Sequence, residues 1–322
     1  MKRGLLAAVA ATLAWSLLYI FPRIIGDYTA FDLAVVSYAV AGSGALVILW
    51  RYRTQVKALT LRDWLTVGLL GFLGYIGYFF LITSAVMSAG PVLPPVMLGC
   101  VPIVLAIAGN LKSRSVPWRS ISLPLLAGAL GIMLVNLDTL VSSRLDASYS
   151  LLSVSLGILA SLTAIGFWTG FGIINERALA RRPEMNPLLW SALLIISCSI
   201  EMVMFLPVGV AMKLSAVVSQ SGPLSGGWEL LMSGVIQGLV ATLGGAWAWS
   251  IAARKIPLAL GGQLIASQTI YATIMGLMME HRWPSTLEAL GTVMVFVGVV
   301  TAINQFYKYA RRTQQGQDLM LP

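Results

Sequence analysis

The sequence has few charged residues: Asp, Glu, Lys and Arg make up only 10% of its 322 residues, and 58% are hydrophobic. A typical soluble domain carries roughly 25% charged residues. A soluble enzyme with one apolar core is therefore disfavoured, because so few charges could not cover its surface. Intrinsic disorder is excluded, since it requires low hydrophobicity and high net charge. The composition indicates a polytopic membrane protein.

Residues that carry chemistry are also scarce. The two cysteines, Cys100 and Cys198, lie inside apolar runs, and we interpret them as small buried hydrophobic residues rather than a disulfide framework. One histidine, His281, does not suggest a metal site. No Gly-Lys dipeptide occurs, which excludes a phosphate-binding loop for ATP. We expect no catalytic residue, no metal and no cofactor, and hence no enzyme.

The apolar residues form ten stretches, each near the length of about 20 residues that a helix needs to cross a bilayer. The runs are continuously apolar, whereas barrel strands would alternate, so we predict an all-α membrane protein. The ten expected helices cover residues 4–22, 31–50, 64–87, 90–111, 121–137, 151–175, 187–211, 229–252, 256–279 and 285–307.

The basic residues fall on one side of this predicted topology. With a cytoplasmic N-terminus, 17 of the 21 Lys and Arg residues lie in cytoplasmic segments. The other four are Arg23, Arg144, Lys213 and Arg282. This bias predicts that both termini are cytoplasmic. The net charge of +9 therefore reflects topology, and no nucleic-acid partner is expected.

Corresponding motifs recur in the two halves of the chain. Ala14-Trp15-Ser16 in the first helix corresponds to Phe167-Trp168-Thr169 in the sixth, and Asp63-Trp64 in the third corresponds to Gly227-Trp228 in the eighth. Five helices per half make the second half inverted, which is the plan of many secondary transporters. We predict one five-helix repeat over 1–137, an outer linker over 138–150, a second repeat over 151–307 and a cytoplasmic tail over 308–322.

These motifs, with the Pro91-Val92 start of the fourth helix, resemble the drug/metabolite transporter superfamily of the EamA type. Glu280 at the end of the ninth helix fits the acidic residue common in the family, whereas Lys112-Ser113-Arg114 departs from it in the fourth. Residues 99–104 and 109–111 resemble one group of bacterial inner-membrane proteins within it. The resemblance implies a ten-helix permease that moves small organic molecules, often exporting them, through a central cavity.

Glu201 is the most informative single residue. It lies inside the predicted seventh helix, roughly 20 Å from the cytoplasmic end at a rise of 1.5 Å per residue. An ionised carboxylate at that depth is costly unless it is hydrated, paired or protonated. It is a candidate for coupling to protons or another cation; the alternatives are a protonated side chain bonded to a neighbouring helix and one that reaches the outer interface.

Other polar and aromatic residues in the spans are candidates for substrate binding. Gln263, Ser267 and Tyr271 follow one another at i+4 steps in the ninth helix, on one expected stripe. Amides offer donors and acceptors, and aromatic walls suit apolar, aromatic or cationic ligands. Interhelical hydrogen bonding and core packing are the alternatives for all of them. The remaining candidates are Trp15, Tyr75, Tyr78, Trp168, Gln237 and Trp247, the last beside Trp249.

Proline and glycine shape the predicted helices. Pro102, within the fourth helix, cannot donate a backbone hydrogen bond and is expected to kink the helix at a gating position. Glycines recur every third residue from Gly68 to Gly77 in the third helix, which permits close helix approach.

The sequence thus predicts a secondary-active transporter, an exporter of a small metabolite, amino acid or drug-like solute, in a bacterial inner membrane. The alternative is a non-transporting membrane scaffold, chaperone or lipid-handling protein. The expected partners are a small-molecule substrate, the lipid bilayer and protons. The substrate, the direction of net flux and the oligomeric state stay open at this point.

Overall fold

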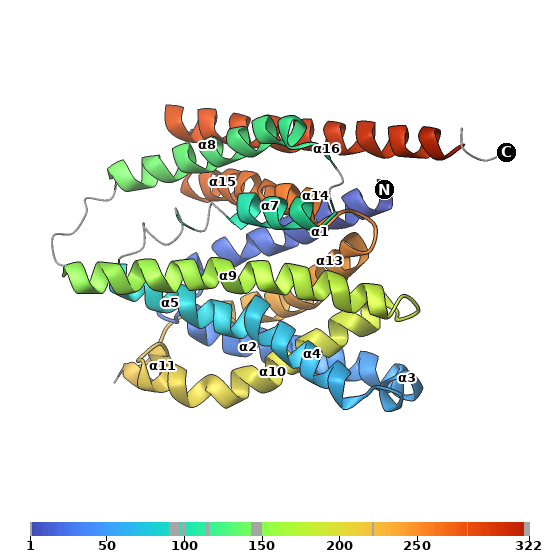
Figure 1. Ribbon diagram of the computed structural model, residues 1–322. Helices are drawn as coiled ribbons and strands as arrows, with labels where there is room; N and C mark the ends of the chain where they lie inside the picture. Colours follow the sequence, from blue (N-terminus) through green and yellow to red (C-terminus); the bar gives the residue numbers. More distant parts are fainter. Residues whose placement is uncertain are drawn as a thin grey trace. The chain divides into compact units, whose positions relative to one another are not determined.

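The computed structural model describes residues 2–89, 97, 101–113, 116–142, 150–220, 222–281 and 283–318. Within these ranges, no side chain is described at residues 19, 102, 103, 106, 112, 113, 135–142, 269, 280 and 310–318. The described chain is helical apart from short turns and contains no strand, which confirms the predicted all-α class (Figure 1).

Five helical elements precede residue 60, and four more reach residue 113: α1 (Lys2–Ser16), η1 (Leu17–Tyr19), η2 (Phe21–Arg23), α2 (Ala30–Arg51) and α3 (Arg53–Lys57), then α4 (Leu61–Gly71), η3 (Phe72–Ile76), α5 (Gly77–Ala89) and α7 (Val101–Ser113). The elements that follow, up to residue 253, are α8 (Trp118–Ser142), α9 (Leu151–Arg181), α10 (Pro187–Ala211), α11 (Ala216–Ser219), α12 (Gly227–Ile236), η4 (Gln237–Gly244) and α13 (Gly245–Ala253). The last three helices are α14 (Leu258–Ile265), α15 (Ser267–Glu280) and α16 (Thr286–Asp318).

In the described part of the chain, seven helical stretches are long and apolar enough to cross a membrane, by length and composition. They cover Lys2–Arg23, Ala30–Arg51, Leu61–Ala89, Leu151–Arg181, Pro187–Ser219, Gly227–Ala253 and Thr286–Tyr309, and they coincide with the expected first, second, third, sixth, seventh, eighth and tenth spans. The expected fifth span lies within α8. The expected fourth falls partly on residues 90–96 and 98–100, outside the described part of the chain, so ten spans stay a prediction.

Several helices begin at capping residues that the sequence displays. Thr29 and Asp32 form a capping box at the start of α2, and Thr60 and Asp63 form another at the start of α4. In each, the threonine side chain accepts the backbone N–H of the aspartate and the carboxylate accepts the backbone N–H of the threonine. These boxes fix the first turn of two apolar helices, whose remaining stability comes from packing.

The chain divides into two compact units, each drawn from both halves of the sequence. Unit 1 comprises residues 1–78 and 174–254, and unit 2 comprises residues 79–173 and 255–322. In unit 1, α2 packs against α10, α12 and η4, and α10 packs also against α4, η3 and α13. The first helix, α1, packs against α13. The division describes compactness in space and leaves the predicted repeat boundaries untested.

In the described part of unit 2, several helix pairs pack together. α8 and α16 run side by side, and α7 packs against α14 (Figure 1). Part of α9 packs closely on α5, because Gly157 admits Ala89: a Cβ atom at Gly157 would lie 2.4 Å from the Cβ of Ala89. Ser153 of α9 donates a hydrogen bond to the carbonyl of Ser88 at 2.6 Å.

Two predicted helices contain a π-helical segment, which the apolar pattern did not indicate. η3 interrupts the third span and η4 interrupts the eighth, and both segments are rich in glycine or adjoin it. The motifs Asp63-Trp64 and Gly227-Trp228 place η3 and η4 at corresponding distances along their helices. π-Helical turns are rare and frequently mark functional positions.

Candidate functional site

The predicted substrate-binding residues are divided between the two units. Unit 1 holds Trp15, Tyr75, Tyr78, Gln237 and Trp247, with the candidate coupling residue Glu201. Unit 2 holds Trp168, Gln263, Ser267 and Tyr271. We therefore describe the two groups separately.

Trp15 packs against the eighth helix in unit 1. Its ring centroid lies 5.5 Å from that of Trp249, and both rings are about 95% buried, with exposed fractions of 6% and 5%. Gly245 makes the approach possible, because a Cβ atom there would lie 2.5 Å from Trp15 Nε1. Trp247 lies on another face of α13 and is 44% exposed. The aromatic partner of Trp15 is thus Trp249, and the substrate-binding candidate Trp247 lies apart from this pair.

The carboxylate of Glu201 lies between α10 and the end of α4. Its Oε1 accepts a hydrogen bond from Ser197 Oγ at 3.2 Å, one helical turn earlier. Its Oε2 is buried and has no hydrogen-bond partner among the described residues. A Cβ atom at Gly71 would lie 3.0 Å from Oε1 and 3.2 Å from Oε2, so the carboxylate rests on the bare backbone of α4. The close contact explains why glycine stands at position 71.

Tyrosine side chains from two other elements lie in the region of this carboxylate. The side chain of Tyr38 in α2 lies close enough to those of Tyr75, Cys198 and Glu201 to interact with them electrostatically. Tyr75 of η3 also packs against the apolar cluster of α2, α10 and α13 that includes Ala45 and Ala246. Tyr78 is half-buried at the start of α5. The structure therefore brings Tyr75 and Glu201 into one neighbourhood, which sequence spacing could not show.

Gln237 is the most buried predicted polar residue of unit 1. It is the first residue of η4, is 6% exposed, and its Oε1 has no hydrogen-bond partner among the described residues. A buried amide oxygen without a donor is unfavourable by about 1–3 kcal/mol. Unit 1 thus holds two buried oxygen acceptors, Gln237 Oε1 and Glu201 Oε2, that can receive a donor from outside the described protein.

In unit 2, Trp168 forms an aromatic pair within its own helix. Its ring lies 5.3 Å from that of Phe171, with an angle of 32° between the ring planes. Trp168 itself is half-buried. Its expected counterpart, Trp15, is instead buried against another helix, so the two motif tryptophans have different surroundings.

The expected polar stripe of the ninth helix is interrupted. α14 ends at Ile265 and α15 begins at Ser267, so Gln263 and Ser267 lie on opposite sides of a break at Ala266. The hydroxyl of Ser267 donates to the carbonyl of Leu264 at 2.6 Å, which helps to satisfy the backbone at the break. Tyr271 is half-buried in α15.

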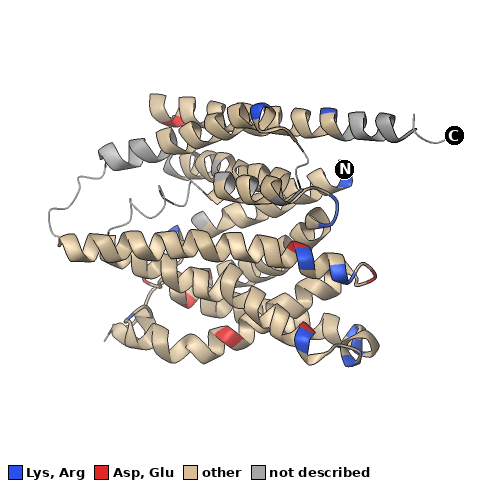
Figure 2. Ribbon diagram, viewed as in Figure 1, with Lys and Arg blue, Asp and Glu red and all other residues tan. Residues whose placement is uncertain are grey.

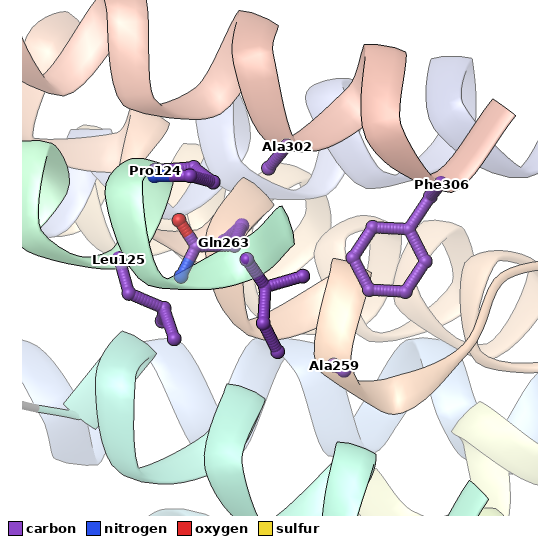
Figure 3. A pocket seen from close by; sticks show the side chains of 7 residues that line it. Pro124, Leu125, Ala259, Gln263, Ala302 and Phe306 are labelled. Carbon is purple, nitrogen blue, oxygen red and sulfur yellow. The ribbon is translucent and has the colours of Figure 1, made fainter. Parts of the chain in front are cut away.

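Gln263 lies in a narrow crevice of unit 2 (Figure 3). Figure 3 shows its carboxamide beside Pro124 and Leu125 of α8. The crevice has about 190 Å³ of space between atoms, but none of it is wide enough for a water molecule. Its lining is apolar apart from Gln263, and it holds no room for a solute in this conformation. The residues that line it are Ile121, Pro124, Leu125, Ala259, Gln263, Ala302 and Phe306.

Pro102 is the second residue of α7. Its side chain and residues 98–100 before it lie outside the described part of the chain, so the expected kink and gating role stay predictions. Among the residues that are described, no three His, Cys, Asp or Glu side chains gather as a metal site would require.

Two networks of hydrogen bonds join the ends of the unit 1 helices. The sequence patterns did not predict either of them. At one end, Asp63 accepts a hydrogen bond from Arg182, and the guanidinium of Arg254 donates to the carbonyls of Arg182 and Pro183. The Lys and Arg residues of α3, of the start of α4 and of the α9–α10 turn gather at this end (Figure 2). The capping motif at Asp63 was visible in the sequence, but the partner arginines were not.

The second network lies at the opposite ends of α2 and α10. The buried carboxylate of Asp32 accepts hydrogen bonds from Ser215 Oγ at 2.6 Å and from the backbone N–H of Ala216 at 3.0 Å. Nearby, Asp27 accepts the backbone N–H and the hydroxyl of Ser225 at 2.9 and 2.7 Å. These two donors hold the pKa of the exposed Asp27 below its ordinary value.

Comparison with known proteins gives one curated relative and a shared fold. The chain is 25% identical to "Inner membrane protein YtfF" of Escherichia coli (strain K12) over 311 residues, which cover 94% of this chain and 95% of the relative. A protein of known crystal structure superimposes with a TM-score of 0.74 at 17% identity, over 94% of this chain and 97% of that one. No family model matches the chain.

YtfF is a member of the drug/metabolite transporter superfamily, and it represents the group that residues 99–104 and 109–111 resemble. The relative therefore confirms the resemblance that the sequence motifs indicate. The solved structure establishes the fold alone.

Proposed function

We propose that this protein is a secondary-active transporter that exports a small organic solute by alternating access. The proposal includes ten membrane-spanning helices in a five-plus-five inverted repeat, an inner-membrane location and cytoplasmic termini. It includes no catalytic step, cofactor or resident metal. The observation that carries it is the pairing of corresponding helices, because inverted repeats are the plan of many secondary transporters.

The helix pairing supports the repeat in three places. The expected second helix packs against the seventh, the fourth against the ninth and the fifth against the tenth, as α2–α10, α7–α14 and α8–α16. Each of these pairs joins corresponding members of the two halves. A two-fold relation between the halves would produce such pairs, whereas two independent five-helix domains would not.

The packing of the other helices supports the same relation. α1 packs against α13 at the end of the eighth helix, and α9 packs against α5 at the end of the third. Under the repeat, the first and sixth helices correspond, and so do the third and eighth. The π-helical segments η3 and η4 lie in the same corresponding pair.

The basic end of unit 1 supports cytoplasmic termini. Arg182 and Arg254 lie at this end with Asp63, and Asn186 of the α9–α10 turn donates to Tyr52 Oη at 3.1 Å. The polar ends of α4, α10 and α13 thus meet where the basic residues concentrate. Membrane proteins place such basic clusters on the cytoplasmic side.

Gln237 is the strongest candidate for substrate contact in unit 1, since its buried Oε1 has no donor among the described residues. We propose that the substrate carries a hydrogen-bond donor for this oxygen, and that Trp15, Tyr75 and Tyr78 contribute aromatic surface. Trp168, Gln263, Ser267, Tyr271 and Trp247 remain substrate-binding candidates, and Glu201 is the candidate coupling residue.

A ligand screen followed by a flux assay tests the proposal. Purified protein is screened by thermal shift against amino acids, organic cations and drug-like amines, and each hit is assayed for counterflow in proteoliposomes. We expect at least one hit to accumulate by counterflow, and Gln237→Leu to reduce that flux. A stable protein that yields ligand-induced shifts or a tightly bound partner protein, yet no counterflow, would support a non-transporting scaffold instead.

A further inference from the structure

We propose that Glu201 binds the coupling proton, and that the end of α4 at Gly71 senses whether the proton is bound. This inference rests on the proposed transport function and names its coupling ion. It is carried by the position of the Glu201 carboxylate between α10 and α4, with one buried oxygen unpaired among the described residues.

The described helices that pack around Glu201 place no countercharge beside it. Glu201 is the only charged residue from 188 to 212, and residues 33–50, 64–89 and 230–253 contain no Asp, Glu, Lys or Arg. An ionised carboxylate at this depth in a membrane-spanning helix, without a countercharge, is costly by about several kcal/mol. A bound proton removes this charge.

The titratable groups that face Glu201 are neutral ones. They are Tyr38 of α2 and Cys198 of α10 itself, and Tyr75 of η3 lies beside these two residues. From α4, the charged residues Arg62 and Asp63 lie in the first turn, about two helical turns before Gly71. The other elements packed on α10, η4 and α13, contain no titratable residue. A proton therefore exchanges with Glu201 without an ion-pair partner.

The ligand set favours a proton over a metal cation. Hard cations such as Ca²⁺ and Mg²⁺ take six or more oxygen ligands. Here one hydroxyl, Ser197 Oγ, bonds the carboxylate, and the described residues add no second carboxylate. The backbone of Gly71, which offers no side-chain oxygen, lies against the carboxylate on the α4 side.

Because the Glu201 carboxylate contacts Gly71, binding or loss of the proton affects how α10 packs against α4. A neutral carboxylic acid can stay packed on the α4 backbone, with the new O–H bond formed on Oε2. When that proton leaves to water, the ionised oxygen requires hydration, and water can enter only if α10 and α4 separate. Gly71 immediately precedes the π-helical segment η3, where the helix is already loosened, so the separation is absorbed there.

Infrared difference spectroscopy in lipid nanodiscs tests proton binding directly. We expect a pH-dependent carboxylic-acid C=O band that is lost in Glu201→Gln and kept in Glu229→Gln, a control at a carboxylate in the first turn of α12. The proposal is overturned if the wild-type band is absent throughout pH 5–9, if it survives in Glu201→Gln, or if sodium at constant pH removes it.

A glycine pair tests the contact with α4 and covers the case in which Glu201→Gln misfolds. In Gly71→Ala the new methyl group meets both carboxylate oxygens, whereas in Gly68→Ala it lies 3.7 Å from Ser197 Oγ, an ordinary contact. We expect Gly71→Ala to shift the midpoint of the band and Gly68→Ala to leave it unchanged. Equal midpoints in both variants would show that Gly71 does not sense the proton.

The flux assay separates this inference from the proposed function. Counterflow without the Glu201 band would leave the carrier and remove the proton site. The band without counterflow would leave the proton site and contradict the carrier. Net solute uptake that a pH gradient drives in the wild-type protein, and no longer drives in Glu201→Gln, supports both the carrier and the proton site.

Discussion

Asp63 accepts a hydrogen bond from the guanidinium of Arg182, and this ion pair joins the start of α4 to the turn between α9 and α10. Arg254, at the end of α13, donates to the carbonyl of Pro183 at 2.9 Å in the same turn. Side chains from the ends of two helices, α4 and α13, thus converge on one turn at the basic end of unit 1. The convergence fixes how those ends meet, although the residues are far apart in sequence.

A double-mutant cycle measures the Asp63–Arg182 pair. The exposed fractions of the Arg182 and Asp63 side chains are 40% and 16%, so solvent screens the pair and we expect a coupling of about 0.5–1 kcal/mol. Asp63→Asn, Arg182→Gln and the double variant are compared by thermal unfolding in detergent. Arg181→Gln, at the exposed neighbouring position, is the control. Strictly additive effects would show that the pair contributes nothing.

Asp32 and Asp27 form a matched pair of aspartates in unit 1. Asp32 is buried and accepts hydrogen bonds from Thr29, Ser215 and Ala216, whereas Asp27 is exposed. We expect Asp32→Ala to destabilise the protein by about 2 kcal/mol or more, since buried donors lose their acceptor. Asp27→Ala should have a much smaller effect. Thermal unfolding checks both, and similar losses in the two variants would contradict the burial of Asp32.

Gly245 controls the position of Trp15. In Gly245→Ala the methyl group would meet the Trp15 indole, whereas at Gly166 of α9 no atom lies within 4 Å. We expect Gly245→Ala to displace the Trp15–Trp249 pair, which changes tryptophan fluorescence and raises KM for the transported solute. Gly166→Ala should change neither. Unaltered fluorescence in Gly245→Ala would show that the two rings do not pack as described.

Gln237 separates stability from substrate contact. Because no described residue donates to its Oε1, Gln237→Leu removes an unpaired buried oxygen and is expected to leave the melting temperature unchanged or higher. Counterflow should nevertheless fall, since the substrate loses its acceptor. A variant that melts lower and transports normally would assign Gln237 a structural role.

The apolar runs predicted the helices well because membrane spans depend on local composition. The capping motifs at Thr29 and Thr60 were likewise local and readable. The contact of Glu201 with Gly71 was not, since it depends on how α10 and α4 pack. Trp249 could not be distinguished from Trp247 as the partner of Trp15, because two residues in one helix turn differ only in the face they present.

The interruptions within helices also escaped the sequence. The i+4 stripe from Gln263 to Tyr271 assumed a continuous helix, but the chain breaks at Ala266, a good helix former. The π-helical segments contain or adjoin glycines, which favour close helix packing as readily as loosened turns. In both places tertiary packing decides the backbone.

Solute counterflow in proteoliposomes tests the central claim most directly. Vesicles that contain the purified protein are loaded with a solute identified by thermal shift, and uptake of the labelled solute is followed against protein-free vesicles. The account predicts a transient accumulation of label above equilibrium that Gln237→Leu reduces. Label that only equilibrates, at the same rate with and without protein, for every solute that binds, would contradict a carrier.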